Sequence, residues 1–294
     1  MKVTMHLVAC AIVALGAPCL LAETLSTESF DYPAGQPLAG QSGGSGWGAN
    51  AWTASSRYSI VSGLSFSDLS VSDNAVQINY PNSTNSQEVA NRKVASTANP
   101  STLWVSYLYR PDTVVNNHYN GLQVNASTSN VGAAVLRVAN RGWSTNNGGV
   151  GVDNSIAFGS QPYVDGTTYL AIAKFSGLNT TTVTGKRWLL TEADYDALKI
   201  DGLTEAELNL NALTLDYATE TVTFGSPLAF DTNKYVQLQF VTSTGTSQAV
   251  TYDEISHATD INDLFPVPEP ATMAMLALAA GGLAGYARRR GRRA

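Results

Sequence analysis

The sequence is poor in cysteine, histidine and charge. Both cysteines, Cys10 and Cys19, lie in the first 22 residues, and only His118 and His257 follow that stretch. Once the stretch is removed, the chain has no disulfide and no thiol nucleophile. Two histidines without paired spacing indicate neither an imidazole metal site nor a Ser-His-Asp triad, so we expect no metal and no cofactor.

Long apolar runs are confined to the two ends of the chain. Residues 1–22, MKVTMHLVACAIVALGAPCLLA, have Lys2 near the start, then an apolar run, then small residues up to Ala22. This order is typical of a secretory signal peptide. A first helix of the domain is the alternative, but the run lacks an amphipathic period. The lipoprotein-like residues 7–10 come too early, because no proper apolar region precedes them.

Positive charge is scarce between those ends. Lys2 and five C-terminal arginines account for six of the 17 basic residues, and Glu269 for one of the 23 acids. Residues 23–266 therefore contain 11 Lys and Arg against 22 Asp and Glu, a net charge near −11. Such a surface repels phosphates, so we exclude a nucleic-acid partner.

The C-terminal end combines three features in a fixed order. Pro268 and Pro270 hold Glu269 in an extended segment, because each proline lacks an amide hydrogen and restricts the residue before it. Residues 271–287 carry no charge and would span roughly 25 Å as a helix. The flanking arginines form a cytoplasmic stop signal that leaves the preceding domain outside the membrane. They are Arg288, Arg289, Arg290, Arg292 and Arg293.

This end resembles the PEP-CTERM sorting signal of Gram-negative bacteria. The resemblance implies recognition by a membrane-embedded exosortase, with cleavage near residues 268–270. It also implies export through the inner membrane, transient anchoring there, and delivery to the cell surface or extracellular matrix. Such proteins accompany exopolysaccharide and biofilm systems, so exosortase and an exopolysaccharide are the expected partners. A plain membrane anchor is the alternative.

Residues 23–266 show short apolar or alternating runs separated by Gly, Asn, Ser and Asp, without a repeat of fixed period. This pattern predicts an all-β jelly-roll sandwich. The expected strands are 58–61, 75–80, 103–110, 121–125, 133–138, 155–158, 168–175, 183–190, 221–224, 235–241 and 249–255.

Two segments break the strand pattern. Thr191 and Thr204 are each followed by acidic residues and then by leucine, which is typical of helix starts. We expect two short surface helices there, inserted between strands.

The order of landmarks resembles a subset of PEP-CTERM proteins with a concanavalin-like, laminin-G-type jelly roll. The landmarks are ESFDY at 28–32, GQSGGSGW at 40–47, LSFSDL at 64–69 and YDEI at 252–255. The implied fold is common in carbohydrate-binding domains and in glucanases, and the domain would span residues 23–266, before the sorting signal at 267–294.

One acidic run imitates two kinds of site. Glu192, Asp194 and Asp196 alternate like the carboxylates of jelly-roll glucanases, but a helix would point them in different directions. As a calcium loop the run fails, because Leu198 stands at a ligand position and Lys199 where glycine is needed. No catalytic residue is therefore assigned.

Two amide-rich stretches are the candidate glycan-binding loops. In the first, Asn140 and Arg141 precede Trp143, whose ring could stack on a sugar in a long hairpin loop spanning 140–149. In the second, His118 and Tyr119 lie among asparagines. The alternative is that Trp143 packs back onto a sheet edge and the asparagines serve turns.

The sequence thus predicts an exported, exosortase-sorted surface or matrix protein that is non-catalytic, with a structural role or weak glycan binding. The competing class is a polysaccharide-acting hydrolase or lyase whose carboxylates come from separate strands. Two acids within about 5–10 Å on a concave face would favour the enzyme. A cleft with Trp or Tyr and no such pair would favour binding.

Overall fold

The computed structural model describes residues 23–80, 86–113, 118–126, 134–141, 147–153, 155–200, 203–242 and 247–265. The expected signal peptide and C-terminal sorting signal lie outside these residues. Within them, no helix is both long and apolar enough to cross a membrane.

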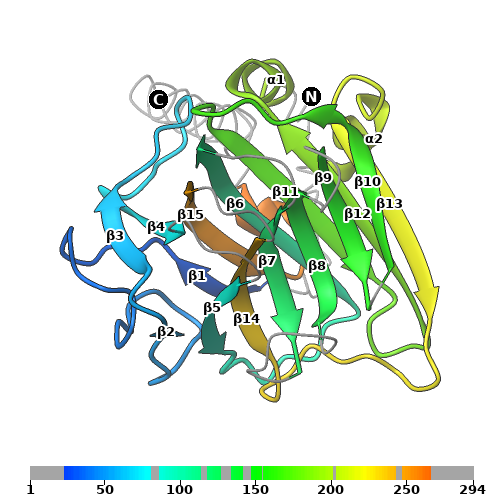
Figure 1. Cartoon of the computed structure of the whole chain (residues 1–294). Helices are drawn as coiled ribbons and strands as arrows, with labels where there is room; N and C mark the ends of the chain where they lie inside the picture. Colours follow the sequence, from blue (N-terminus) through cyan, green and yellow to red (C-terminus); the bar gives the residue numbers. More distant parts are fainter. Residues whose placement is uncertain are drawn as a thin grey trace, which may run out of the picture.

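The described chain forms two antiparallel sheets, which we call sheet A and sheet B (Figure 1). Sheet A has the order β13 (Asp216–Thr223), β12 (Thr182–Leu190), β11 (Tyr169–Ser176), β6 (Thr102–Thr113), β15 (Gln248–Ala258), β4 (Asn74–Tyr80) and β3 (Tyr58–Ser62), with β1 (Thr24–Glu28) also paired to β15. Sheet B has the order β10 (Ser155–Pro162), β9 (Asn147–Val152), β8 (Ala134–Arg141), β7 (His118–Asn125), β14 (Tyr235–Thr242), β5 (Ser86–Lys93) and β2 (Thr53–Ala54).

The connectivity is that of a jelly roll. Consecutive strands β4 and β5, β6 and β7, and β14 and β15 lie in opposite sheets, so the chain wraps around the core. The late strands insert between early ones, with β15 between β6 and β4 and β14 between β7 and β5. The predicted all-β jelly-roll sandwich is therefore confirmed.

The core between the sheets is filled by apolar residues at alternate strand positions. Sheet A contributes a group of tyrosines, of which Tyr107 and Tyr109 contact Tyr252 at ring-centroid distances of 5.9 and 5.5 Å. Sheet B contributes mostly aliphatic side chains. The Tyr58 hydroxyl donates to the Leu238 carbonyl at 2.8 Å, which ties the two sheets together across the core.

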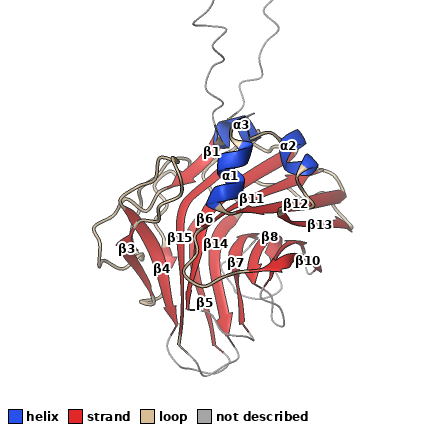
Figure 2. Cartoon of the chain, turned by 90° about the horizontal axis from the view of Figure 1, so that it is seen from above, coloured by secondary structure: helices blue, strands red, loops and turns tan. Residues whose placement is uncertain are grey.

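A second apolar cluster lies on the other face of sheet A. Trp104 and Trp188 stack there with their centroids 6.0 Å apart, under buried residues of the short helices. These helices are α1 (Glu192–Leu198), α2 (Glu205–Leu210) and α3 (Ile261–Leu264). The molecule therefore has three layers, namely sheet B, sheet A and the helical layer (Figure 2).

Helices α1 and α2 begin where the sequence predicts. The Thr191 hydroxyl accepts from the Asp194 amide, and the Asp194 carboxylate accepts from the Thr191 amide at 2.9 Å. This reciprocal capping box satisfies amide donors that the first helical turn leaves unpaired. At α2, the Thr204 hydroxyl accepts from the Glu207 amide at 3.2 Å.

Four strands and one helix escaped prediction. They are β1, β2, β5, β9 and α3. Strand β9, NGGVGV, interrupts its valines with glycines, so the sequence shows no alternating strand pattern there, and the predicted loop covers its first three residues, Asn147 to Gly149. The expected long loop at 140–149 is wrong at both ends, because β8 continues to Arg141 and β9 begins at Asn147. Strand β5 carries the charged Arg92 on the side that faces the core, so its sequence lacks an apolar run.

The two ends of the described chain lie side by side. The Glu23 amide donates to the Thr259 hydroxyl at 3.1 Å, and the Thr259 amide donates to the Glu23 carbonyl at 3.1 Å. Figure 2 shows β1 and α3 next to each other on the side that carries α1. The described chain therefore begins and ends at one place on the domain.

Candidate functional site

Several strand ends meet at one end of the sandwich, which we call the loop end. There β4, β6, β8 and β14 finish and β5, β7, β9 and β15 begin. The register confirms this arrangement, because Thr242 pairs with His118 and Gln248 pairs with Tyr80. Ala258, beside the chain ends, lies at the opposite end of β15. At about 3.3 Å per residue, the two ends of β15 are roughly 33 Å apart.

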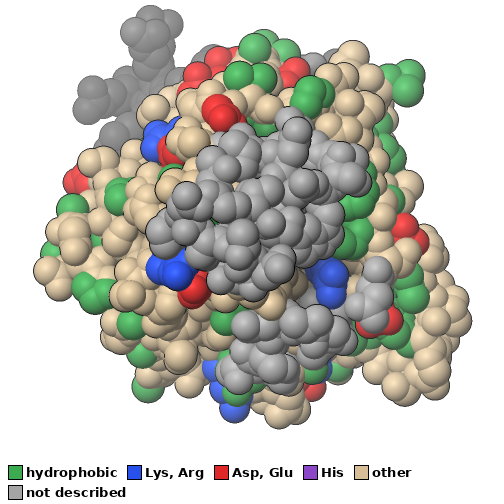
Figure 3. Space-filling view, in the orientation of Figure 1, with side chains coloured by type: hydrophobic (Ala, Val, Ile, Leu, Met, Phe, Trp, Pro, Cys, Tyr) green, Lys and Arg blue, Asp and Glu red, His purple; other side chains and the backbone are tan. Residues whose placement is uncertain are grey.

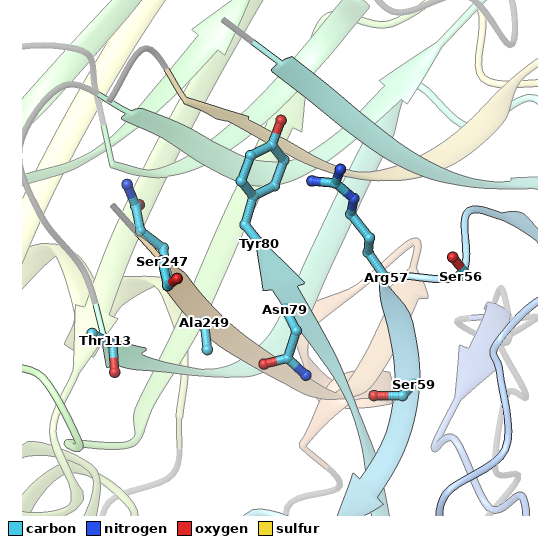
Figure 4. A pocket seen from close by; sticks show the side chains of 9 residues that line it. Ser56, Arg57, Ser59, Asn79, Tyr80, Thr113, Ser247 and Ala249 are labelled. Carbon is cyan, nitrogen blue, oxygen red and sulfur yellow. The ribbon is translucent and has the colours of Figure 1, made fainter. Parts of the chain in front are cut away.

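The loop end holds an open pocket of about 590 Å³, which we call the loop-end pocket (Figure 4). Its walls come from the start of β3, the end of β4, the end of β6 and the start of β15. The lining side chains are hydroxyls, amides, one phenol, one guanidinium and one methyl group. The residues are Ser56, Arg57, Ser59, Asn79, Tyr80, Thr113, Ser247, Gln248 and Ala249.

Arg57 is held in a fixed position in this pocket. Its Nε lies 3.2 Å from Oε1 of Glu88, on the neighbouring sheet. Its guanidinium carbon lies 4.6 Å from the ring centroid of Tyr80, which in turn stacks on Phe240 at 5.2 Å. Figure 4 shows the Arg57 and Tyr80 side chains extending in the same direction from neighbouring strands. A cation over an aromatic face is attracted by the ring electrons, so the ion pair and the ring together orient the guanidinium.

Two polar atoms of the pocket lack hydrogen bonds. Nη1 of Arg57 and the hydroxyl of Tyr80 are buried, and neither has a partner in the part of the chain that the structure describes. Leaving a buried donor unpaired costs about 1–3 kcal/mol. Both atoms are closed off from the open space, so the accessible polar groups of the pocket are the hydroxyls and amides of its lining.

A row of amides crosses the outer face of sheet B, nearer the end of β7 and β14 that lies away from the loop end. Gln123 on β7 donates through Nε2 to Oε1 of Gln237 on β14 at 2.7 Å, and Asn125 donates to the same oxygen at 2.9 Å. Arg137 on β8 and Asn91 on β5 stand at the same level, as partners of Gln123 and Gln237. Gln123 and Asn91 are only 1 % and 5 % exposed, so the row is held tightly in place.

The sequence analysis missed both the amide row and the pocket. The row has a local signal, because glutamine and asparagine alternate with apolar residues in Y-V-Q-L-Q-F-V and G-L-Q-V-N. This alternation predicts a polar outer face, but says nothing of which strands become neighbours. The pocket has no local signal, since its residues come from four separate segments.

The structure places the predicted loop residues near one another at the loop end. His118 and Tyr119 begin β7, Asn140 and Arg141 end β8, and Asn120 pairs with Arg141. Trp143 and the side chains of His118, Asn140 and Arg141 lie outside the described residues. Their role in binding therefore stays a prediction.

Tyr119 differs from the expected loop position. It lies within β7 and is 5 % exposed, so its ring is not an open platform for a sugar. Burial raises the pKa of its hydroxyl to about 12, although the nearby Arg137 charge acts in the opposite direction. The hydroxyl therefore stays protonated at neutral pH, where it can donate a hydrogen bond but cannot serve as a general base.

The acidic run on α1 is built as a helix, as the sequence predicts. Asp194 belongs to the capping box, and Asp196 lies 2.7 Å from the Lys199 ammonium. Glu192 accepts from the Ser67 amide at 3.2 Å. Within the described residues, no group of three or more His, Cys, Asp or Glu side chains could hold a metal ion.

The C-terminal residues 266–293 match the PEP-CTERM protein-sorting motif. The chain therefore carries this motif, as Pro268, Glu269, Pro270 and the arginine cluster indicate. The motif indicates export with a membrane-anchored sorting signal in a Gram-negative bacterium, and implies processing by an exosortase. A comparison with curated proteins finds no match.

Several solved structures resemble the sandwich. A protein of unknown function from Shewanella oneidensis MR-1 aligns at 14 % identity and TM-score 0.46, over 79 % of this chain and 84 % of that one. A carbohydrate esterase from the Shiga toxin-encoding bacteriophage phi24B aligns at 16 % and 0.43, over 81 % and 99 %. An endo-β-1,4-glucuronan lyase from Trichoderma reesei aligns at 11 % and 0.40, over 79 % and 96 %. Similarity at this level carries no conclusion about activity.

Proposed function

We propose that this protein is a non-catalytic, glycan-binding component of the bacterial surface or extracellular matrix. The sorting motif supports the location, and the context it suggests is an exopolysaccharide. The observation that carries the binding activity is the loop-end pocket, an open space of about 590 Å³ lined mainly by hydroxyl and amide groups. Such groups pair with sugar hydroxyls, and the volume lies in the range of ordinary ligand sites.

The alternative is a polysaccharide hydrolase or lyase. Its chemistry would need an acid and a base within reach of one bond. The described pocket lining contains no carboxylate and no imidazole, so it holds no pair of acids for glycoside hydrolysis. The proposal therefore favours binding.

A glycan array on the exported protein tests the proposal. We expect binding that Ala249→Trp abolishes, because the indole would fill the pocket that Ala249 lines. Thr221→Trp is the matched control, since it places the same ring on an exposed strand position of β13, away from the pocket. Equal binding by the two variants would place the glycan elsewhere.

Incubation with the bound polysaccharide tests the non-catalytic part of the proposal. We expect neither new reducing ends nor an unsaturated ultraviolet-absorbing product. The appearance of either one would contradict the binding assignment and favour the enzyme.

A further inference from the structure

We propose that the outward sides of α1 and α2 rest on the surface of the bilayer that anchors the precursor. The inference concerns an interaction surface and does not depend on glycan binding. Three observations support it: an exposed apolar stripe on each helix, the position of both helices on the face where the described chain ends, and the short tether that follows.

Helices α1 and α2 each bury one side against sheet A. Tyr195 and Leu198 on α1 and Leu208 on α2 belong to the apolar cluster on the outer face of that sheet. The opposite side of a surface helix is normally polar, because water covers it. In this protein the opposite side of both helices carries a second set of apolar residues.

These exposed apolar residues repeat at the same spacing, i, i+4 and i+7, so each set follows one side of its helix into the next turn. We call the two sets the outer helical face: Ala193, Ala197 and Ile200, then Ala206, Leu210 and Leu213. Ile200, Leu210 and Leu213 are 80 %, 76 % and 100 % exposed. Figure 3 shows hydrophobic side chains between acidic ones at the top of the view, where Figure 1 places α1. Large aliphatic side chains this exposed on two consecutive helices are typical of an interaction surface.

The described chain ends on the same side of the molecule. Ile261 on α3 belongs to the same buried cluster as Tyr195 and Leu208, and Phe265 packs against that cluster. Figure 2 shows α1, α2 and α3 together on the side of sheet A that faces away from sheet B. The segment that leads to the sorting motif therefore starts on the side that carries the outer helical face.

The tether to the membrane is short. Five residues, 266–270, separate Phe265 from the uncharged run that begins at Ala271, and three of the five are prolines. Their six chain steps reach at most roughly 20 Å, and proline makes such a segment stiff. Because we expect residues 271–287 to span the membrane, the helical layer would stay within that distance of the bilayer. A surface tethered so closely needs little affinity of its own, since its effective concentration is high.

The charge of the helical layer indicates how it would contact lipid. Residues 191–215 contain six acids and one lysine, Lys199, whose ammonium lies 2.9 Å from the Asp68 carboxylate and 2.7 Å from that of Asp196. Such a segment is repelled by anionic headgroups, because it offers them no cluster of basic residues. The contact would therefore come from aliphatic side chains that leave water at the interface, and a neutral lipid should be preferred.

The experiment measures lipid contact of the anchored, full-length precursor in phosphatidylcholine vesicles. A fluorophore on Ala206→Cys reports on the outer helical face, and one on Ser160→Cys, on β10 of sheet B, reports on the other side of the domain. Cys10 and Cys19 belong to the expected signal peptide, so each exported precursor carries one labelling site. We expect nitroxide-labelled lipid to quench the first fluorophore and not the second, and phosphatidylglycerol to weaken the quenching.

Leu210→Asn together with Leu213→Asn should lower the ratio of lipid-contacting to free domains by at least about tenfold, because two aliphatic side chains no longer leave water. Val164→Asn is the matched control. Val164 is 60 % exposed between β10 and β11, outside the helical layer, so the loss of its side chain should leave the quenching unchanged. Thermal melting shows that each variant is folded, and exposed substitutions of this kind change stability little.

Three results would overturn the inference. Absence of quenching at Ala206→Cys in the otherwise unchanged precursor would show that the outer helical face does not touch lipid. Quenching that survives Leu210→Asn with Leu213→Asn, or that grows with phosphatidylglycerol, would assign the contact to other groups. A change of oligomeric state in the double variant without a change of quenching would mean that a second copy of the chain covers the face. None of these results bears on glycan binding by the loop-end pocket.

Discussion

Asp253 is a buried acidic residue at a bulge in β15. It is fully buried, and its two carboxylate oxygens accept from the Leu64 and Glu254 amides, each at 2.9 Å. Burial, with the neighbouring Glu254 charge as a second cause, raises its pKa to about 8. Glu254 itself has a φ of +49°, a strained backbone conformation that the tie to the 64–72 segment maintains.

Because the pKa of Asp253 is raised in the folded protein, we expect the stability of the fold to fall as the pH rises. The folded pKa lies above the unfolded value near 3.9, so its contribution is full below about pH 4 and is lost as pH rises through 8. We expect the melting temperature to decline between pH 6.5 and 9, and Asp253→Asn to flatten that decline. An unchanged slope in the variant would assign the pH dependence to other groups.

The protonation of His257 does not change the stability between pH 6.5 and 9. Burial lowers its pKa to about 3, so folding is weakened only as pH falls from about 6.5 toward 3. Above pH 6.5 the ring is neutral in both states. The ring of His257 therefore does not contribute to the change in stability above pH 6.5, and the comparison with Asp253→Asn separates Asp253 from Glu254, whose pKa burial also raises.

Trp143 provides a second prediction at the scale of the residue. If its loop stacks on a sugar, Trp143→Ala should weaken glycan binding by about 1–2 kcal/mol and leave stability nearly unchanged. If the ring packs onto a sheet edge instead, the same change should lower stability by about 3–5 kcal/mol through the cavity it leaves. Melting curves beside a binding assay distinguish the two, and a large melting shift would end the sugar-platform hypothesis for this loop.

At the scale of the element, β1 and β5 are joined by a buried ion pair between the two sheets. Arg92 on β5 pairs with Glu28 on β1, and both side chains are almost completely buried. The carboxylate also accepts from the Trp52 indole and the Tyr32 hydroxyl, each at 2.9 Å. Arg92 lies 5.0 Å from the centre of the Trp47 ring. A strand that buries an arginine does not look like a strand in sequence.

Removing one partner of this pair should be strongly destabilising. Arg92→Met leaves the buried Glu28 carboxyl group without its cation, which costs about 3–5 kcal/mol of unfolding free energy. Chemical denaturation measures the loss. Arg57→Met is the control, because its partner Glu88 retains 16 % exposure and can remain solvated. Equal losses in the two variants would mean that burial does not determine the importance of the pair.

At the scale of the whole molecule, the chain ends and the pocket lie at opposite ends of β15. Thr24 pairs with Ala258, and Gln248 lines the pocket. The sorting motif begins at residue 266, directly after α3 and its following residue. We therefore expect the anchored precursor to hold the helical layer near the membrane and the pocket away from it.

We expect the processing of the anchored precursor to depend on Glu269. Glu269→Ala should block cleavage and leave the full-length protein in the membrane fraction, because the extended Pro-Glu-Pro segment would no longer present the carboxylate. Deletion of residues 271–294 is the control and should give a soluble exported protein. Mass spectrometry of the secreted form measures both. An intact arginine tail on the mature extracellular protein would rule out exosortase cleavage.

The sequence by itself determined the features that depend on neighbouring residues. Alternation within a strand, the threonine caps of α1 and α2, and the C-terminal motif are local patterns, and all are recovered. Eleven strands could be predicted because each has its own apolar run. Four strands, β1, β2, β5 and β9, were missed; β5 places Arg92 on its core side, and β9 interrupts its core valines Val150 and Val152 with glycine.

Only the tertiary structure decided which distant segments become neighbours. Arg57 and Glu88 pair across the two sheets, and Gln123 meets Gln237 at a separation of 114 residues. No spacing in the chain encodes these contacts, because they depend on strand order and register, which the packing of the whole core selects. The packing of the core also buries the side chain of Tyr119 on β7 and leaves a pocket beside Arg57.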